Sequence, residues 1–246
     1  MDIRNLLGEF SSETDFKEIR NNVSGQFEEG DACFLRNFIL NFKPKLVFHA
    51  GLFKGLTTVL LLKALSYVNF EELVCVDIHK ECIDDTVNVI RKLGLNGSKV
   101  KILLRDLNVI KDTFRPIFDF YFFDAGHDAE TCWNYLNWIS ESHKDFYVWV
   151  HDANLVGNVV KSKVEGGIIW KLVNTCELDY YHTGLLMREY GGEFRRGSST
   201  PLAVSIVFKA SSFEIKKFLY REGKLVKQLI FDRNRFIGMT MRNYLI

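Results

Sequence analysis

Proline is scarce in this chain of 246 residues. It has three prolines, and no stretch rich in serine, glycine or proline interrupts it. Linkers between domains usually have such a composition, so we expect a single domain over residues 1–246. With 47% hydrophobic residues, a chain of this length can bury a full core. Within this domain we distinguish a helical cap (1–44), a central core (45–210) and a basic C-terminal extension (211–246).

Cysteine motifs and long apolar runs are also missing. The five cysteines are scattered and form no C-x-x-C pair, which argues against a zinc site and for reduced thiols. The longest apolar stretch, Val59–Leu65, is too short to span a bilayer, and the N-terminus lacks the order of a signal peptide. A formal net charge of +1 gives no general attraction to nucleic acid or membranes. We therefore expect a cytoplasmic protein without a membrane partner.

Two common phosphate-binding motifs are absent, although a glycine loop is present. No G-x-x-x-x-G-K-[ST] run occurs, which excludes a P-loop. In residues 45–58 a short apolar run leads into a turn with Gly51 and Gly55, and an apolar helix follows at once. These glycines lack the dinucleotide spacing G-x-G-x-x-G, and Phe53 takes the place of the second glycine, which argues against NAD or FAD. The loop favours a smaller adenosine ligand without phosphates.

Apolar segments with the pattern of buried strands alternate with helical patterns along the chain. This alternation predicts an α/β fold, a doubly wound parallel sheet with helices on both faces. Ligands bind beyond the carboxyl ends of the strands in such sheets, so the acids that follow four of the strands (Asp77, Asp106, Asp124 and Asp152) should meet at one site. Strands are expected near 46–50, 73–77, 99–104, 117–123, 145–151, 185–187 and 202–208, and helices near 32–42, 55–68, 79–94, 128–142 and 166–176.

Together these segments resemble the class I S-adenosylmethionine-dependent methyltransferases. They are most similar to the small-molecule and sugar O-methyltransferase branch, which includes macrocin O-methyltransferases and proteins labelled cephalosporin hydroxylases. The matching stretches are Ala50–Thr58, Val76-Asp77, Asp124–His127 and Val150–Asp152, within a resemblance over about residues 28–208. The resemblance implies a Rossmann-like sheet of seven strands with an antiparallel last strand. It also implies S-adenosyl-L-methionine as cofactor and methyl transfer to a hydroxyl of a small molecule or sugar.

The residues assigned to the cofactor lie at the expected strand ends. Asp77 is placed to accept hydrogen bonds from both ribose hydroxyls, or else to cap the next helix. Thr57 either binds the cofactor's carboxylate at a helix start or is an ordinary helix residue. His49 stands where the family usually has an acid, which is a departure from the motif. The full set is Gly51, Phe53, Gly55, Thr57, Asp77, Asp106, Leu107 and Asp124, with Asp106 and Leu107 at the adenine edge.

Two chemistries are open for activating the acceptor. His127 and His151 follow strand ends and are candidates for the general base, since histidine titrates near neutral pH; of the two we favour His151. Each also has a structural use as a capping or core-edge imidazole. In the second chemistry Asp124 and Asp152 hold Mg²⁺, as relatives of the catechol O-methyltransferase type imply. Asn154 is then the candidate third ligand.

The C-terminal extension is basic, with eight Lys or Arg residues against two acids over residues 216–246. We expect a hairpin around Arg221–Lys224. Such a hairpin can grip an anionic acceptor or nucleic acid, pack against a second subunit in a homodimer, or remain a solvated face. Three functions stay open: an O-methyltransferase with a small-molecule acceptor, a methyltransferase fold that binds without turnover, and a nucleic-acid methyltransferase. The missing N/D-P-P-Y-like run argues against the third.

Overall fold

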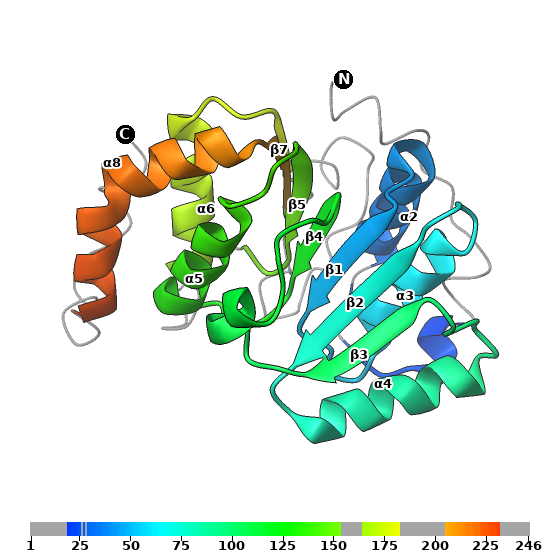
Figure 1. Cartoon of the computed structure of the whole chain (residues 1–246). Coiled ribbons are helices and arrows are strands. Elements are labelled where there is room, and N and C mark those ends of the chain that lie inside the picture. Colours follow the sequence, from blue (N-terminus) through cyan, green and yellow to red (C-terminus); the bar gives the residue numbers. More distant parts are fainter. Residues whose placement is uncertain (1–18, 26, 28, 154–163, 183–204, 232–246) are drawn as a thin grey trace, which may run out of the picture.

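The computed structural model describes residues 19–25, 27, 29–153, 164–182 and 205–231. A seven-stranded sheet with the strand order β3-β2-β1-β4-β5-β7-β6 forms its centre (Figure 1). Strands β1 to β5 pair in parallel, and β7 is antiparallel to both β5 and β6. The predicted fold class is therefore confirmed. The strands are β1 (Leu46–Ala50), β2 (Glu72–Asp77), β3 (Val100–Leu104), β4 (Phe120–Phe123), β5 (Phe146–Val150), β6 (Tyr180–His182) and β7 (Ile206–Ala210).

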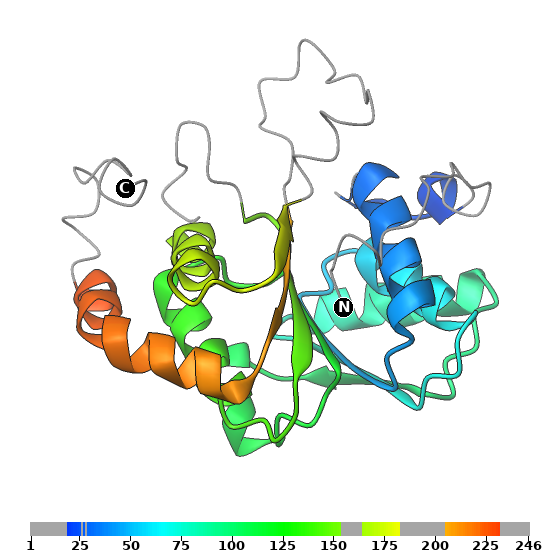
Figure 2. The ribbon, with the colours of Figure 1, turned by 90° about the horizontal axis from the view of Figure 1, so that it is seen from above.

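Helices cover both faces of the sheet, as Figure 2 shows from above. On one face α2 packs against α3, and α3 packs against α4. On the other face α5 contacts the 3₁₀ helix η2, α6 and α8. The bounds are α2 (Glu29–Phe42), α3 (Leu56–Leu65), α4 (Lys80–Lys92), η2 (Leu107–Asp112), α5 (Ala129–Ile139), α6 (Val164–Thr175) and α8 (Ser212–Phe231).

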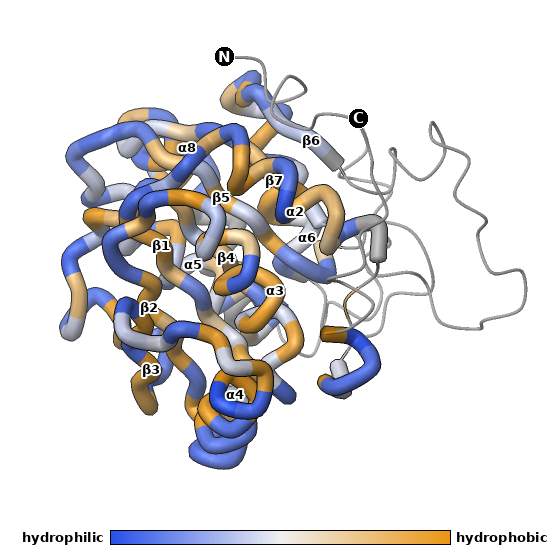
Figure 3. The backbone as a smooth tube through the Cα atoms, turned by 90° about the vertical axis from the view of Figure 1, so that its right-hand side faces the viewer, coloured by the Kyte–Doolittle hydropathy of each residue, from blue (hydrophilic) through white to orange (hydrophobic). Residues whose placement is uncertain are grey.

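Alternating side chains of the strands build one apolar core on each face. Along β1, Val47 belongs to the core under α2 and α3, whereas its neighbour Phe48 belongs to the core under α5. Nearly every residue of α3 is buried, while α4 buries Ile83, Thr86 and Ile90 along one stripe. In Figure 3 the tube of α3 is accordingly mostly orange, and that of α4 mixes orange with blue. Burial on both sides explains why the central strands β1, β4 and β5 read as nearly continuous apolar runs.

The connections reverse direction between β1 and β4. The chain moves outward from β1 to β2 and β3, then returns to the other side of β1 to form β4 and β5. Ala50 and Phe123 are partners in the register, so β1 and β4 end side by side. In sheets of this kind the reversal leaves a crevice beyond the carboxyl ends of the two central strands. Gly51 and Asp124, which follow these strands, therefore lie at the expected ligand position.

The C-terminal hairpin predicted around Arg221–Lys224 is wrong, because this segment lies within helix α8. The turn signal came from Gly223, which disfavours a helix by only about 1 kcal/mol. Three apolar side chains at helical spacing, Ile215, Phe218 and Leu219, are buried against the core and outweigh that cost.

Other differences concern the end of the sheet and the termini. Strand β6 was not predicted, because three residues are too few to show a period. The strand expected at 185–187 and residues 1–18 of the expected helical cap lie outside the described residues. Among the helices that the structure describes, none has the length and apolar character needed to cross a membrane.

Candidate active site

The glycine loop after β1 is shaped by backbone that glycine alone adopts easily. Gly51 and Gly55 have φ of 90° and 82°. A Cβ on Gly51 would lie 2.0 Å from the backbone oxygen of Asp124. Gly55 is the N-cap of α3 and has no side chain to cap it, so a ligand can use the amide groups of the first turn. This geometry fits the predicted role of Thr57 in that turn, which stays a prediction.

Asp77, at the end of β2, fastens the glycine loop to the neighbouring strand. Its Oδ2 accepts a hydrogen bond from the amide of Leu52 at 2.7 Å, and its Oδ1 accepts one from the amide of His79 at 2.8 Å. A carboxylate has about four acceptor positions, so each oxygen retains one for a ligand. The structure thus holds Asp77 rigidly beside Gly51 and Leu52. Its bond to ribose stays a prediction.

Large apolar side chains are exposed around this carboxyl edge of the sheet. Phe53 follows β1, Ile78 follows β2, and Leu104 ends β3 directly opposite Asp77 in the register; their exposures are 60%, 58% and 46%. Exposed apolar groups next to a fixed carboxylate suit a ligand with an apolar base and a sugar diol. These residues therefore fit an adenosine group. Phe53 itself has a φ of 46°, in the left-handed region that bulky residues rarely adopt.

Asp106 and Leu107 connect β3 to the helix η2. The Asp106 carboxylate accepts a hydrogen bond from the amide of Asn108 at 2.8 Å and so caps η2, while Leu107 is buried. The capping role uses one acceptor position of Asp106 and leaves the others. Both residues lie at the predicted edge of the sheet, and their contact with adenine stays a prediction.

His49 is neutral in this fold. Its side chain is fully buried at the end of β1, and burial lowers its pKa to about 4 despite the charges of Asp124 and Asp77. The ring Nδ1 lies 3.3 Å from the hydroxyl oxygen of Thr58. The position that carries an acid in the resembling family therefore contributes no negative charge here.

His151 is held between two carboxylates. Its Nδ1 lies 2.8 Å from Oδ1 of Asp124, and its Nε2 lies 3.9 Å from Oδ2 of Asp31 in α2. Phe27 stacks on the ring at a centroid distance of 5.0 Å. Burial lowers the pKa of His151, but Asp124 and Asp31, together with Asp152, outweigh it and raise the pKa to about 9. At neutral pH the ring is thus an imidazolium, with 2% of the residue exposed.

His127 faces the same aspartate from the other side. Its Nδ1 lies 2.9 Å from Oε2 of Glu165 in α6, and its Nε2 lies 3.9 Å from Oδ1 of Asp124. The hydroxyl of Tyr135 donates to the second oxygen of Glu165 at 2.7 Å. Burial lowers the pKa of His127, but the hydrogen bond and charge of Glu165, with Asp124 and Asp152, raise it overall. Its side chain remains 22% exposed, so a ligand can reach it.

The structure therefore brings Asp124, His127 and His151 together as predicted, and adds two acids that the sequence motifs did not indicate. Asp31 and Glu165 each lie in the first turn of a helix, where acids are common, so the sequence gave no sign that both are buried. Their partners could not be named, because the pairs join residues far apart in the chain.

These residues do not fit the predicted Mg²⁺ site. The inner oxygen of Asp124 is bonded to the His151 imidazolium, and a cation at that position would face another positive charge. Within the described ranges, no group of three or more His, Cys, Asp or Glu side chains is arranged to hold a metal ion. Asn154 lies outside those ranges.

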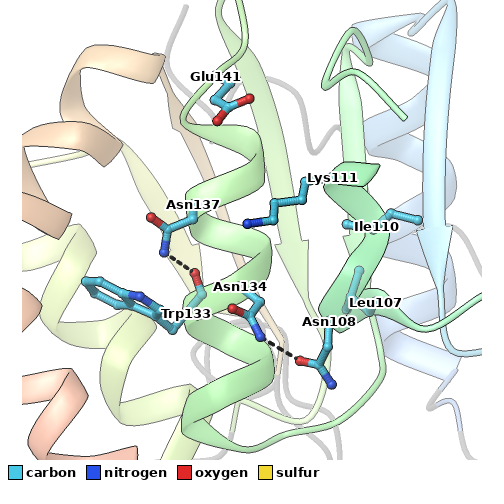
Figure 4. Close-up of a pocket in the computed structure, with 8 residues that line it drawn as sticks. All are labelled: Leu107, Asn108, Ile110, Lys111, Trp133, Asn134, Asn137 and Glu141. Carbon is cyan, nitrogen blue, oxygen red and sulfur yellow. Dashed lines mark hydrogen bonds between the residues drawn. The ribbon is translucent and has the colours of Figure 1, made fainter. Parts of the chain in front are cut away.

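A cavity of about 280 Å³ lies elsewhere, between η2 and α5 (Figure 4). In it the amide of Asn134 donates to the side-chain oxygen of Asn108, and the amide of Asn137 donates to the backbone of Trp133. Leu107 is the one lining residue shared with the predicted cofactor set. Neither Asp77 nor Asp124 lines the cavity, so it lies apart from the glycine loop and the histidines. Its lining is Leu107, Asn108, Ile110, Lys111, Trp133, Asn134, Asn137 and Glu141.

Comparison with known proteins agrees with the fold and its motifs. Residues 48–153 match the model of a methyltransferase domain family. No curated protein matches the chain. Among solved structures, the O-methyltransferase from Bacillus cereus in complex with S-adenosylhomocysteine is 16% identical, with a TM-score of 0.56 over 82% of this chain and 93% of that one. The O-methyltransferase TomG from Streptomyces achromogenes, in complex with S-adenosylmethionine, is 14% identical, with a TM-score of 0.57 over 84% and 94%.

The matched segment runs from β1 to the turn after β5, and so contains the glycine loop and all four acids at the strand ends. At such low identity, the solved structures support the fold alone. The activity class is supported by the match to the methyltransferase domain model. Residues 48–153 therefore match a methyltransferase domain, and they have the Rossmann-like sheet that the motifs predict.

Proposed function

We propose that this enzyme transfers a methyl group from S-adenosylmethionine to a hydroxyl of a small molecule or sugar. The observation that carries the proposal is the carboxyl edge of the sheet, where β2, β1 and β4 end side by side. There Asp77 is held by two backbone amides beside Gly51 and Leu52, next to exposed Phe53, Ile78 and Leu104. The two solved O-methyltransferases named above support the choice of a hydroxyl acceptor, and they are described with the cofactor or its product bound.

The rim of the crevice supplies the groups for chemistry. When bound, S-adenosylmethionine provides an electrophilic methyl group, and the electron pair of the broken carbon–sulfur bond stays on sulfur. We assign the general base to His127, because its Nε2 is not engaged by Glu165 and its side chain is partly exposed. His151 is buried and protonated at neutral pH, so it serves to hold Asp124 in place. This reverses the preference for His151 that the sequence suggested.

The alternative of a nucleic-acid methyltransferase has less support. It depended on a basic hairpin at the C-terminus, and that segment is the helix α8 up to Phe231. Within α8, the carboxylate of Glu222 pairs with Lys171 and lies 3.6 Å from Arg221, which offsets part of the positive charge. A fold that binds without turnover remains the second candidate, since His49 removes the acid of the first motif.

Calorimetric titration with S-adenosylmethionine and S-adenosylhomocysteine tests the proposal. Asp77→Ala should weaken binding by about 1–3 kcal/mol, or about 5- to 150-fold, the range for losing hydrogen bonds to a charged group. Asp145→Ala is the matched control. Asp145 is an exposed aspartate directly before the first residue of β5, and so lies at the edge of the sheet opposite to Asp77. Unchanged affinity in a folded Asp77→Ala protein would refute the cofactor site. Binding without methyl transfer to any hydroxyl probe would favour the non-catalytic alternative.

A further inference from the structure

Glu165 is a buried acid outside the methyltransferase motifs. It lies in the first turn of α6 with 1% of the residue exposed. One carboxylate oxygen accepts the hydroxyl hydrogen bond of Tyr135 from α5, and the other lies 2.9 Å from Nδ1 of His127. Both oxygens are thus used by defined partners. In this arrangement the carboxylate of Glu165 is placed to orient the ring of His127, as the third member of a catalytic triad orients its histidine.

The loop that carries His127 is held in an unfavourable backbone conformation. His127 has a φ of 38°, and the preceding Gly126 has a φ of 81°. A Cβ on Gly126 would lie 2.5 Å from Cγ2 of Thr131. Asp128 fixes the segment by accepting hydrogen bonds from the amides of Glu130 and Thr131. Left-handed residues with a Cβ persist where the surroundings impose them, often at functional sites, and here the result is the pairing of His127 with Glu165.

The hydrogen bond determines which ring nitrogen carries the proton. An ionised Glu165 only accepts, so the neutral imidazole of His127 must carry its hydrogen on Nδ1. The lone pair is then on Nε2, which points to the side of Asp124 at the rim of the crevice. With the opposite tautomer, Nε2 would carry a hydrogen and could not accept one.

We propose that Glu165 is a positioning residue that fixes His127 as its Nδ1–H tautomer, and that Nε2 of His127 takes the proton of the acceptor hydroxyl. This inference rests on the proposed function. As the O–H bond breaks, its proton moves to Nε2, and its electron pair forms the new bond from oxygen to the methyl carbon. Tyr135 supports the arrangement by fixing the second oxygen of Glu165.

The tautomer can be measured directly by long-range ¹H–¹⁵N NMR of the imidazole rings, without cofactor or acceptor. Spectra are recorded from about pH 6 to about pH 10, which spans the ordinary pKa of histidine. The His127 signals are assigned by their loss in His127→Gln. We expect the wild-type protein to show hydrogen on Nδ1 when the ring is neutral. In Glu165→Gln the side-chain amide keeps the bond from Tyr135 but presents its NH₂ group to Nδ1, so the tautomer should invert.

Glu222→Gln is the matched control, because Glu222 is also a mostly buried helical glutamate but pairs with Lys171 instead. It should leave the His127 signals unchanged. Hydrogen on Nε2 in the wild-type protein would overturn the proposal, and so would an unchanged tautomer in Glu165→Gln. If Glu165→Gln fails to fold, the wild-type spectrum decides by itself.

Calorimetry with S-adenosylhomocysteine separates this proposal from the proposed function. Glu165 is not one of the predicted cofactor residues. The affinity of Glu165→Gln for S-adenosylhomocysteine should therefore lie within about twofold of the wild-type affinity, where a tenfold change would correspond to about 1.4 kcal/mol. Absence of binding to the wild-type protein would refute the proposed function, whatever the tautomer. Normal binding with the wrong tautomer would refute the role of Glu165 alone.

Discussion

The buried imidazolium of His151 should make folding stability depend on pH in a defined direction. Its pKa in the fold is about 9, against about 6.5 for an ordinary histidine. Each pKa unit corresponds to 1.36 kcal/mol, so the protonated ring contributes about 3 kcal/mol to the free energy of unfolding. Because the folded pKa is the higher one, this contribution is complete below about pH 6.5. It is lost as the pH rises through about 9.

The assay is urea unfolding of the wild-type protein and of His151→Gln between about pH 6 and about pH 10. The free energy of unfolding of the wild-type protein, minus that of His151→Gln, should be larger by about 3 kcal/mol at the acid end of this range than at its alkaline end. That difference should shrink towards pH 10. Taking the difference between the two proteins removes contributions that both share, such as Cys75, whose pKa is raised by burial.

Two results would refute this reasoning. A constant difference across the pH range would mean that His151 does not titrate near pH 9 in the fold. A difference that grows with pH would mean that the neutral ring is the stabilising form, and that burial outweighs Asp124 and Asp31. Asp31→Asn provides a second test, because removing one of the two flanking charges should move the transition to lower pH.

Much of the sheet could be predicted because local sequence dictates it. Both faces of strands such as β1 and β4 are buried, so each appears as an uninterrupted apolar run. The acids after these runs gather at one edge because parallel strands all end there. Gly51 was recognised for a related reason, since the backbone there has a positive φ and passes close to Asp124. These features depend on neighbours in the chain or on the direction of the strands.

Features that depend on distant packing could not be predicted in the same way. Glu165 and His127 are separated by 38 residues, and Asp31 lies near a histidine from the far end of the matched domain. Sequence alone gave no reason to join them. The helix α8 shows the same limit, because burial against α5 outweighed the turn signal of Gly223. Tertiary contacts therefore determine both the acids that surround the two histidines and the helical conformation of α8.

The acids around the two histidines are consistent with the proposed cationic cofactor, although His49 is neutral. Four carboxyl groups surround the two imidazoles, so this cluster has more acidic than basic side chains. The charge lost at the first motif is thus supplied by residues from other elements, notably Asp31 from α2 and Glu165 from α6. A ligand with a sulfonium and an ammonium group would be attracted to such a rim. The groups are Asp31, Asp124, Asp152 and Glu165, against His127 and His151.

Two further predictions follow from the loop and from the rim. Gly51→Ala should lower the free energy of unfolding by about 3 kcal/mol or more, because the added Cβ would meet the backbone of Asp124. Gly94→Ala should lower it by about 1–2 kcal/mol, because the space around Gly94 is open and only its positive φ is unfavourable. Equal losses for the two variants in urea unfolding would contradict this prediction. Titration with Mg²⁺ should show no saturable site that depends on Asp124, since the His151 imidazolium already occupies the carboxylate oxygen that would bind the ion. Saturable Mg²⁺ binding that disappears in Asp124→Asn would contradict the second prediction, and would mean that the metal displaces the imidazolium.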